Sequence, residues 1–243
     1  MAKTNGLNVR LYVEGYDLSG DANALSGLGY TSELIDVTTL DVSAKKRIVG
    51  VADAEVGVEA WFDPASSRQH AVWTSNSNKM PTADQDILIP MGSAVADPCV
   101  GMVSKQSTYT LTRAPGSAIA ASATYTTSDG SGLEFGTMLT AHDDTHSAAG
   151  SGTVVDGGAA TTNGGAAYLQ IFSLASGSVT VSVQESTSSG GSYTNIVNFS
   201  TVAAAAAPTS ERLAMTGTVA RYLKVTTVGT FSDAVIAVGF TRR

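Results

Sequence analysis

The chain has 243 residues, of which only 14% are charged, and its formal net charge at pH 7 is −7. This length allows two modest domains. The charged fraction is low for a cytosolic enzyme, and the content of β-branched and aromatic residues is too high for a disordered chain. Small residues between short apolar runs are typical of a turn-rich sheet protein.

The charge is distributed unevenly along the chain. Residues 1–150 carry nine Lys and Arg against seventeen Asp and Glu, whereas residues 151–243 carry five against four. A surface that binds nucleic acid needs clustered Lys and Arg, so the acidic first part argues against such a surface. The beginning of the chain lacks an apolar signal segment, and no run approaches the ~20 apolar residues of a membrane helix. We therefore expect neither secretion nor membrane insertion.

The first quarter of the chain predicts strands. Residues 7–13 alternate apolar and polar side chains, with Leu7, Val9, Leu11 and Val13 on the apolar side, as in a half-buried strand. Residues 32–40 predict a second strand, and a polar loop over 41–53 follows it. The clearest alternation of the chain lies in residues 55–62, whose apolar side consists of Val56, Val58, Ala60 and Phe62.

Residues 64–76 predict the one helix of the chain. Pro64 precedes it, Ser66 is the expected N-cap, and Gln69 stands three residues later, where the partner of a capping box belongs. Val72 and Trp73, with Ala65 and Arg68, predict a short apolar stripe that packs on a sheet.

The rest of the chain also predicts strands, separated by turns that contain Gly, Pro or Asp. Before residue 142 they are expected at 87–91, 99–105, 107–113, 119–126 and 133–141. After residue 166 they are expected at 168–174, 179–185, 193–199, 213–219, 222–227 and 235–242. The small and polar residues of 142–166 predict a boundary between a domain over 1–148 and one over 149–243. The expected fold class is therefore all-β with one short helix. We expect a β-sandwich or barrel domain followed by a β-sandwich or jelly-roll domain.

Few residues suggest chemistry. His142, Asp143, Asp144 and His146 form the only cluster with metal-ligand residue types, but the segment lacks the HExxH pattern and a third strong ligand. We interpret it as a solvated loop and expect no metal site. No glycine pattern for phosphate binding occurs. Cys99, the only cysteine, predicts a small buried side chain rather than a reactive thiol. We expect neither an enzyme nor a cofactor.

Lys45, Lys46 and Arg47 form a basic cluster in the acidic half of the chain. Such a cluster is most often the solvated face of a loop. The functional alternative is contact with an acidic patch on a neighbouring copy, where complementary charge sets the register of assembly.

The order of elements over residues 7–76 resembles the tail tube (major tail) proteins of long-tailed bacteriophages. The resemblance rests on LYVEGYDLSGD at 11–21, the long loop around 45–51, VGVEAWFD at 56–63 and the helix after it. LEFGTMLT at 133–140 is similar to a closing strand of these proteins, so the resemblance covers about residues 1–145. It implies a β-sandwich flanked by one helix, with six copies joined edge to edge in a ring.

The same resemblance implies the partners and the place of action. Rings would stack into a tube that conducts the genome, and the loop with Lys45, Lys46 and Arg47 would be the contact between rings. The expected partners are further copies of the chain, the tape measure, tail tip and terminator proteins, and DNA that passes without specific binding. The expected location is the virion tail, after assembly in the host cytoplasm.

An acidic lumen would repel DNA phosphates and let the duplex slide. Glu55, Glu59 and Asp63 are the candidates for lumen-facing acids, because they share one face of the best-defined predicted strand.

Residues 184–200 and 221–229 resemble galactose-binding or discoidin-like jelly rolls, and an immunoglobulin-like domain is the other expected type for this decorating part. Tyr193 and Tyr222 are candidates for a glycan-binding platform. Two alternative functions therefore remain beside the tube subunit. One is a capsid decoration protein, and the other is a glycan-binding adhesion module.

Overall fold

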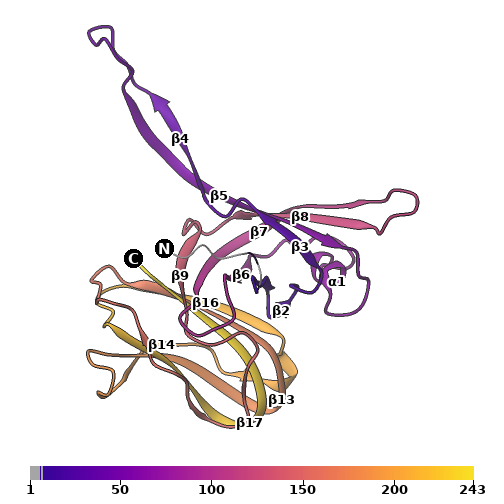
Figure 1. Ribbon diagram of the computed structural model, residues 1–243, viewed down its shortest axis with the longest axis vertical. Coiled ribbons are helices and arrows are strands. Elements are labelled where there is room, and N and C mark those ends of the chain that lie inside the picture. Colours follow the sequence, from indigo (N-terminus) through magenta and orange to yellow (C-terminus); the bar gives the residue numbers. More distant parts are fainter. Residues whose placement is uncertain (1–5, 7) are drawn as a thin grey trace.

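The computed structural model describes Gly6 and residues 8–243 of the chain. The all-β fold class is confirmed, because almost every regular element is a strand and neighbouring strands are antiparallel. Figure 1 shows two lobes, and we call residues 8–138 the N-terminal lobe and residues 144–243 the C-terminal lobe. No helix among the described residues combines the length and apolar character that spanning a bilayer requires.

The N-terminal lobe contains nine strands and one helix. In chain order these are β1 (Tyr12–Val13), β2 (Tyr16–Asp17), β3 (Ala22–Ser26), β4 (Tyr30–Asp36), β5 (Arg47–Trp61), α1 (Gln69–Trp73), β6 (Gln85–Pro90), β7 (Pro98–Thr112), β8 (Ala120–Thr127) and β9 (Glu134–Met138). β8 lies between β5 and β7, and β6 joins β7 to β1. The short helix packs beside these strands (Figure 1).

The expected alternation of β5 is confirmed. Val56, Val58 and Ala60 are buried, whereas Glu55 and Glu59 are exposed on the other face. The buried side contacts Trp73 of α1, which is also completely buried. A two-residue repeat places every second side chain on one face of a strand, so this pattern depends on local geometry alone.

The expected helix over 64–76 is wrong in its length and in its cap. Only Gln69–Trp73 is helical, and Arg68 at the N-cap makes no side-chain capping bond. Ser67 has a φ of 64°, which is incompatible with a helix continuing through it. The carboxylate of Asp21 supplies the missing acceptor, because the N–H of Gln69 donates to its Oδ2 at 3.1 Å. A residue 48 positions earlier in the chain thus caps this helix.

The first two expected strands and the loop after them also differ from prediction, since β4 covers Tyr30–Asp36 rather than 32–40. Only Tyr12–Val13 of residues 8–13 is a strand, both its side chains are buried, and Leu7 lies outside the described residues. The expected loop over 41–53 ends at residue 46, because β5 begins at Arg47 and pairs with β4.

The C-terminal lobe contains eight strands and a 3-10 turn. These are β10 (Asp144–His146), β11 (Gly150–Ser151), β12 (Val155–Asp156), β13 (Gly165–Ser186), β14 (Thr194–Asn198), β15 (Val202–Ala203), η1 (Ala204–Ala206), β16 (Thr209–Met215) and β17 (Tyr222–Arg242). β13 and β17 pair along almost their whole length. Their remaining edges carry the shorter strands on both sides, and a continuous apolar core fills the lobe.

The predicted strands 168–174 and 179–185 are one strand, and so are 222–227 and 235–242. The pairing shifts register at residues 171–173, and the exposed middle of β13 includes Gly177 at a φ of 78°. A Cβ on Gly177 would lie only 1.9 Å from the carbonyl oxygen of Thr230. Small residues that predict a turn therefore allow close approach of two paired strands here.

The two lobes share a core at their junction. Tyr12, Leu88 and Cys99 from the N-terminal lobe pack with Tyr168 and Ala237 from the C-terminal lobe. Cys99 is buried as expected, and burial raises the pKa of its thiol to about 12. Apolar contact of this kind holds the lobes in a fixed arrangement.

Candidate assembly surfaces

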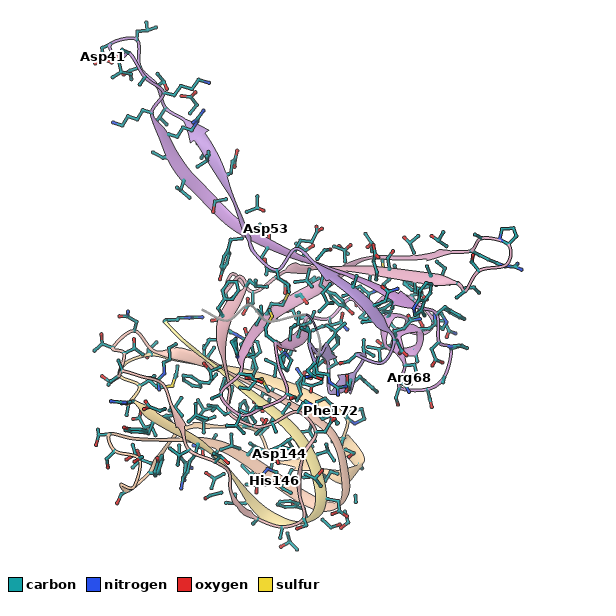
Figure 2. The ribbon with its side chains drawn as sticks, in the orientation of Figure 1. Asp41, Asp53, Arg68, Asp144, His146 and Phe172 are labelled. Atoms are coloured by element: carbon teal, nitrogen blue, oxygen red, sulfur yellow. The ribbon has the colours of Figure 1, made fainter. Side chains whose placement is uncertain are left out.

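A two-stranded arm projects from the N-terminal lobe. It consists of residues 30–51, in which β4 pairs with the first half of β5, and Asp41 lies near its tip (Figures 1 and 2). Every residue of β4 is exposed. No strand other than these two pairs along the arm among the described residues.

The arm exposes apolar side chains that have no cover in the single chain. Val49 is 70% exposed and Val51 is 84% exposed. Other exposed apolar residues of the arm are Tyr30, Leu34, Ile35, Leu40, Val42 and Ile48. An isolated two-stranded ribbon is marginally stable in water, and unpaired strand edges are templates for association. The arm is therefore the strongest candidate assembly surface.

The predicted basic cluster lies at the arm tip. Lys45 and Lys46 are in the turn, and Arg47 is the first residue of β5. Lys45 Nζ lies 3.7 Å from Asp36 of the same arm. Hydrogen bonds from Thr38 lower the pKa of Asp36. Among the described residues, Lys46 and Arg47 make no salt bridge. Their role as a contact between rings stays a prediction.

Of the three predicted lumen acids, two lie in β5 and one lies beyond its end. Glu55 and Glu59 lie on the exposed face of β5 opposite Thr126 and Ser122 of β8, and neither makes a salt bridge within the described chain. Asp63 does not share their strand, because β5 ends at Trp61. Its carboxylate accepts a hydrogen bond from the N–H of Ala65. The premise that all three acids share one strand is therefore wrong for Asp63.

Glu134 is the centre of a charged cluster at the lobe junction. Its carboxylate accepts hydrogen bonds from the Tyr168 hydroxyl at 2.5 Å, from Arg212 Nε at 2.9 Å and from Arg243 Nη2 at 2.7 Å. Asp129 lies 3.1 Å from Arg212 on the other side. Burial, followed by the charge of Glu134, raises the pKa of Tyr168. Charge-assisted bonds of this kind join β9 to β13, to β16 and to Arg243, the residue after β17.

A second acidic pair lies at the same junction. The N–H of Asp86 donates to Glu14 Oε1 at 2.6 Å, and the Ser210 hydroxyl lies 3.2 Å from the same oxygen and 3.4 Å from Asp86 Oδ2. Burial raises the pKa of Glu14. Burial and the neighbouring charge of Glu14 raise the pKa of Asp86 to about 6. Neither carboxylate makes a salt bridge with a described residue.

The two candidate glycan-platform residues each lie under a cation. Lys224 Nζ is 4.4 Å from the ring centre of Tyr193, whose hydroxyl donates to the Ser189 carbonyl. The guanidinium of Arg221 is 5.1 Å from the ring centre of Tyr222. Both rings are partly buried. One face of each ring is thus occupied by a neighbouring cation, and glycan binding stays a prediction.

The histidine segment forms local pairs rather than one constellation. His142 Nδ1 is 3.1 Å from Asp143, and His146 Nε2 is 3.3 Å from Asp144 in β10. Figure 2 shows Asp144 and His146 side by side in the C-terminal lobe. Within the part of the chain that the structure describes, no three His, Cys, Asp or Glu side chains are grouped as metal ligands would be.

The junction acids were not identified as site residues from the sequence. In the sequence, Glu134 belongs only to the motif at 133–140, and no pattern distinguishes Glu14 or Asp86. Their partners are remote in the chain, since Glu14 and Ser210 are 196 positions apart. A charged residue within an apolar strand, such as Glu134 beside Leu133, was the one available signal.

No protein-family model matches the chain, and no curated protein sequence is similar to it. The solved structures similar to it include proteins of phage tails and related particles. A chain of the virion of a native gene transfer agent particle is 13% identical with a TM-score of 0.42, over 55% of this chain and 98% of that one. A chain of the sheath–tube complex of an extracellular contractile injection system is 12% identical with a TM-score of 0.44, over 56% and 92%.

The Dit (gp 19.1) protein of SPP1, described as a hub adsorption apparatus of phages that infect Gram-positive bacteria, is similar over more of the chain. It is 10% identical with a TM-score of 0.36, over 95% of this chain and 98% of that one. All three similarities are too distant to assign this chain to a family.

Proposed function

We propose that the protein is a self-assembling structural component of a phage tail. Its copies would join edge to edge into rings of six, and the rings would stack into a tube that conducts DNA. The observation that carries the proposal is the arm over residues 30–51, whose exposed apolar side chains are uncovered in the single chain. Covering them with further copies would remove apolar surface from water and satisfy the strand edges.

The exposed face of β5 supports the second part of the proposal. Glu55 and Glu59 lie among hydroxyl side chains of β8 and make no salt bridge with described residues. A face of this composition would line a lumen that repels phosphate rather than binding it. We keep Asp63 as a weaker lumen candidate, because its carboxylate accepts a local hydrogen bond.

We also propose the chain's division into a tube-forming part over 1–148 and a decorating part over 149–243. Tape measure, tail tip and terminator proteins would be the further partners, and the protein would be located in the virion tail.

Electron microscopy of the concentrated protein, beside its mass by light scattering, tests self-assembly. Rings or hollow tubes from the intact chain are expected, together with monomers from a variant in which a short Gly-containing turn replaces residues 31–51. Rings that never stack would point to a terminal ring of the tail. Monomers or trimers from the intact chain at every concentration would contradict the proposal and favour a decoration or glycan-binding protein.

The lumen assignment has a test of its own. Tubes of Glu59→Lys are expected to retain duplex DNA at low salt, because the substitution places a cation on the proposed lumen face. Glu211→Lys, which makes the same charge change in the C-terminal lobe, is the matched control. Equal DNA retention by the two variants would place Glu59 outside the lumen.

A further inference from the structure

A pocket of about 300 Å³ lies where the N-terminal lobe meets the β15–β16 connection of the C-terminal lobe. We call it the junction pocket. Val72 of α1 and Pro208 form part of its apolar wall, and Glu14, Asp84 and Gln85 form part of its polar wall. Pockets for small molecules start at about this size, so the junction pocket has room for one long side chain rather than a large ligand.

The polar wall carries negative charge that the chain compensates only in part. Asp84 pairs with Lys105 at 2.9 Å. Glu14 has no cation within salt-bridge distance among the described residues, and its Oε1 accepts a hydrogen bond from the backbone N–H of Asp86, whose own carboxylate is equally unpaired. Burial raises the pKa of Glu14 because a desolvated carboxylate without a cation is costly. A cation that entered the pocket would lower this cost.

Gln85 adds an acceptor without a donor. Its side chain is 3% exposed, and its Oε1 accepts no hydrogen bond from any described residue. A buried amide oxygen without a partner costs about 1–3 kcal/mol. Because solvent does not reach this oxygen either, a cation that entered the pocket would meet the Glu14 carboxylate rather than the Gln85 amide.

The arm tip carries the complementary chemistry. Lys46 and Arg47 are adjacent and exposed, and they have no carboxylate partner in the described chain. The arm leads away from α1 (Figure 1), so its tip cannot reach the junction pocket of its own chain. We infer that the junction pocket receives a basic side chain, Lys46 or Arg47, from the arm tip of a second copy. This inference rests on the proposed self-assembly and names the surface that the arm would meet.

Lys79 and Arg113 are two other exposed cations without a salt bridge in the described chain, and Arg113 is the one that stands on a protrusion. It lies at the exposed end of the β7–β8 hairpin, the second protrusion of the N-terminal lobe, and makes no salt bridge with a described residue. The arm tip is favoured over it because it presents two adjacent cations on a ribbon that also exposes apolar surface. Arg113 therefore provides the matched control for both tests below.

Disulfide trapping tests the contact directly. In the full chain, Lys46→Cys combined with Ala83→Cys places thiols at the arm tip and at the exposed rim of the pocket. After assembly and mild oxidation, a ladder of covalent multimers is expected on a non-reducing gel. Arg113→Cys with Ala83→Cys is expected to give no ladder. A ladder only from the Arg113 pair would overturn the inference.

Charge exchange provides the second test. Lys46→Glu with Arg47→Glu is expected to raise the protein concentration needed for assembly at least tenfold, whereas Arg113→Glu is expected to leave it within twofold. Asp84→Lys in the Lys46→Glu, Arg47→Glu chain is expected to restore most of the loss. Glu14→Gln keeps the hydrogen-bonding shape but removes the charge. It is expected to weaken assembly of the otherwise unchanged chain, and it is expected to restore nothing in the Lys46→Glu, Arg47→Glu chain.

The outcomes separate the inference from the proposed function. If the intact chain assembles but the ladder and the charge rescue are both absent, the proposed function stands and the pocket assignment is wrong. If the intact chain forms no assembly at any concentration, the proposed function fails and the inference fails with it.

Discussion

The carboxylates of the lobe junction have opposite surroundings although they lie close together. Glu134 is buried but accepts hydrogen bonds from two arginines and a tyrosine, so its charge is well compensated. Asp86 is partly buried beside Glu14, and among the described residues only the Ser210 hydroxyl is within hydrogen-bonding distance of its carboxylate. The more distant charges of Arg212 and Asp129 act on it with opposite sign. Removing a charge is therefore expected to have opposite effects at Glu134 and Asp86.

Asp86→Asn is expected to stabilise the protein at pH 7. The pKa of Asp86 is about 6 in the folded chain, against an ordinary value of 3.8. The folded state thus binds the proton more tightly, and the free energy of unfolding falls as pH rises from about 4 to about 6. The free energy of unfolding, measured with urea between about pH 3 and pH 8, should fall less for the variant over this window, and the two chains should not differ at about pH 3.

The matched control is Asp84→Asn, two positions earlier. Hydrogen bonding to Lys105 lowers the pKa of Asp84, so its charge contributes stability at pH 7 that is lost on acidification. Its removal is expected to be slightly destabilising or neutral, because the side chain is exposed. Identical pH profiles for Asp86→Asn and the unchanged chain would contradict the assignment of the pKa of Asp86.

At the scale of elements, the arm differs from the β13–β17 pair in what lies against it. β13 and β17 pair over a buried core, whereas β4 and the first half of β5 pair only with each other among the described strands. Apolar side chains on such a ribbon contribute little to the stability of the single chain. Their contribution is expected when another copy covers them.

Val49→Ser with Val51→Ser tests this difference. The pair is expected to leave the free energy of unfolding of the monomer within about 0.5 kcal/mol, because surface substitutions away from packed contacts have small effects. The same pair is expected to weaken assembly, measured by light scattering against concentration. Val181→Ser, in the buried core of the C-terminal lobe, should destabilise the monomer strongly. A large loss of monomer stability in the arm variant would contradict the exposure of Val49 and Val51 in the single chain.

At the scale of the whole molecule, the lobes are joined by packing as well as by charge. Tyr12 contacts Phe172 edge to face with ring centres 4.7 Å apart. The ring of Tyr168 lies so close to Gly101 that a Cβ there would be 2.5 Å from it. A junction of this kind couples the stability of the lobes to each other.

The whole chain is accordingly expected to unfold in one cooperative transition rather than in two. Calorimetric and van't Hoff enthalpies of the monomer should agree, as they do for two-state proteins. Gly101→Ala is expected to lower the midpoint, because overpacking of a tight contact costs about 1–3 kcal/mol. Gly190→Ala, with open space around its Cβ, is the control and should have little effect. Two separate transitions would show that the lobes are independent.

The sequence determined the features that depend on neighbouring residues. The alternation of Val56, Val58 and Ala60 is confirmed because side chains of a strand point alternately to two faces. The all-β class and the burial of Cys99 followed from similar local information. The exposed, basic character of residues 45–47 was also readable, since no apolar pattern includes them.

Tertiary structure alone decided the features that join distant parts of the chain. Asp21 caps α1 across 48 positions, and β13 runs through the small residues around Gly177 that locally predict a turn. Local propensity cannot anticipate such contacts, because the partner that satisfies a backbone or carboxylate group is fixed only when the chain folds. The same holds for the junction of Glu14 with Ser210 and for the arm, which is a ribbon because β4 pairs with no described strand other than β5.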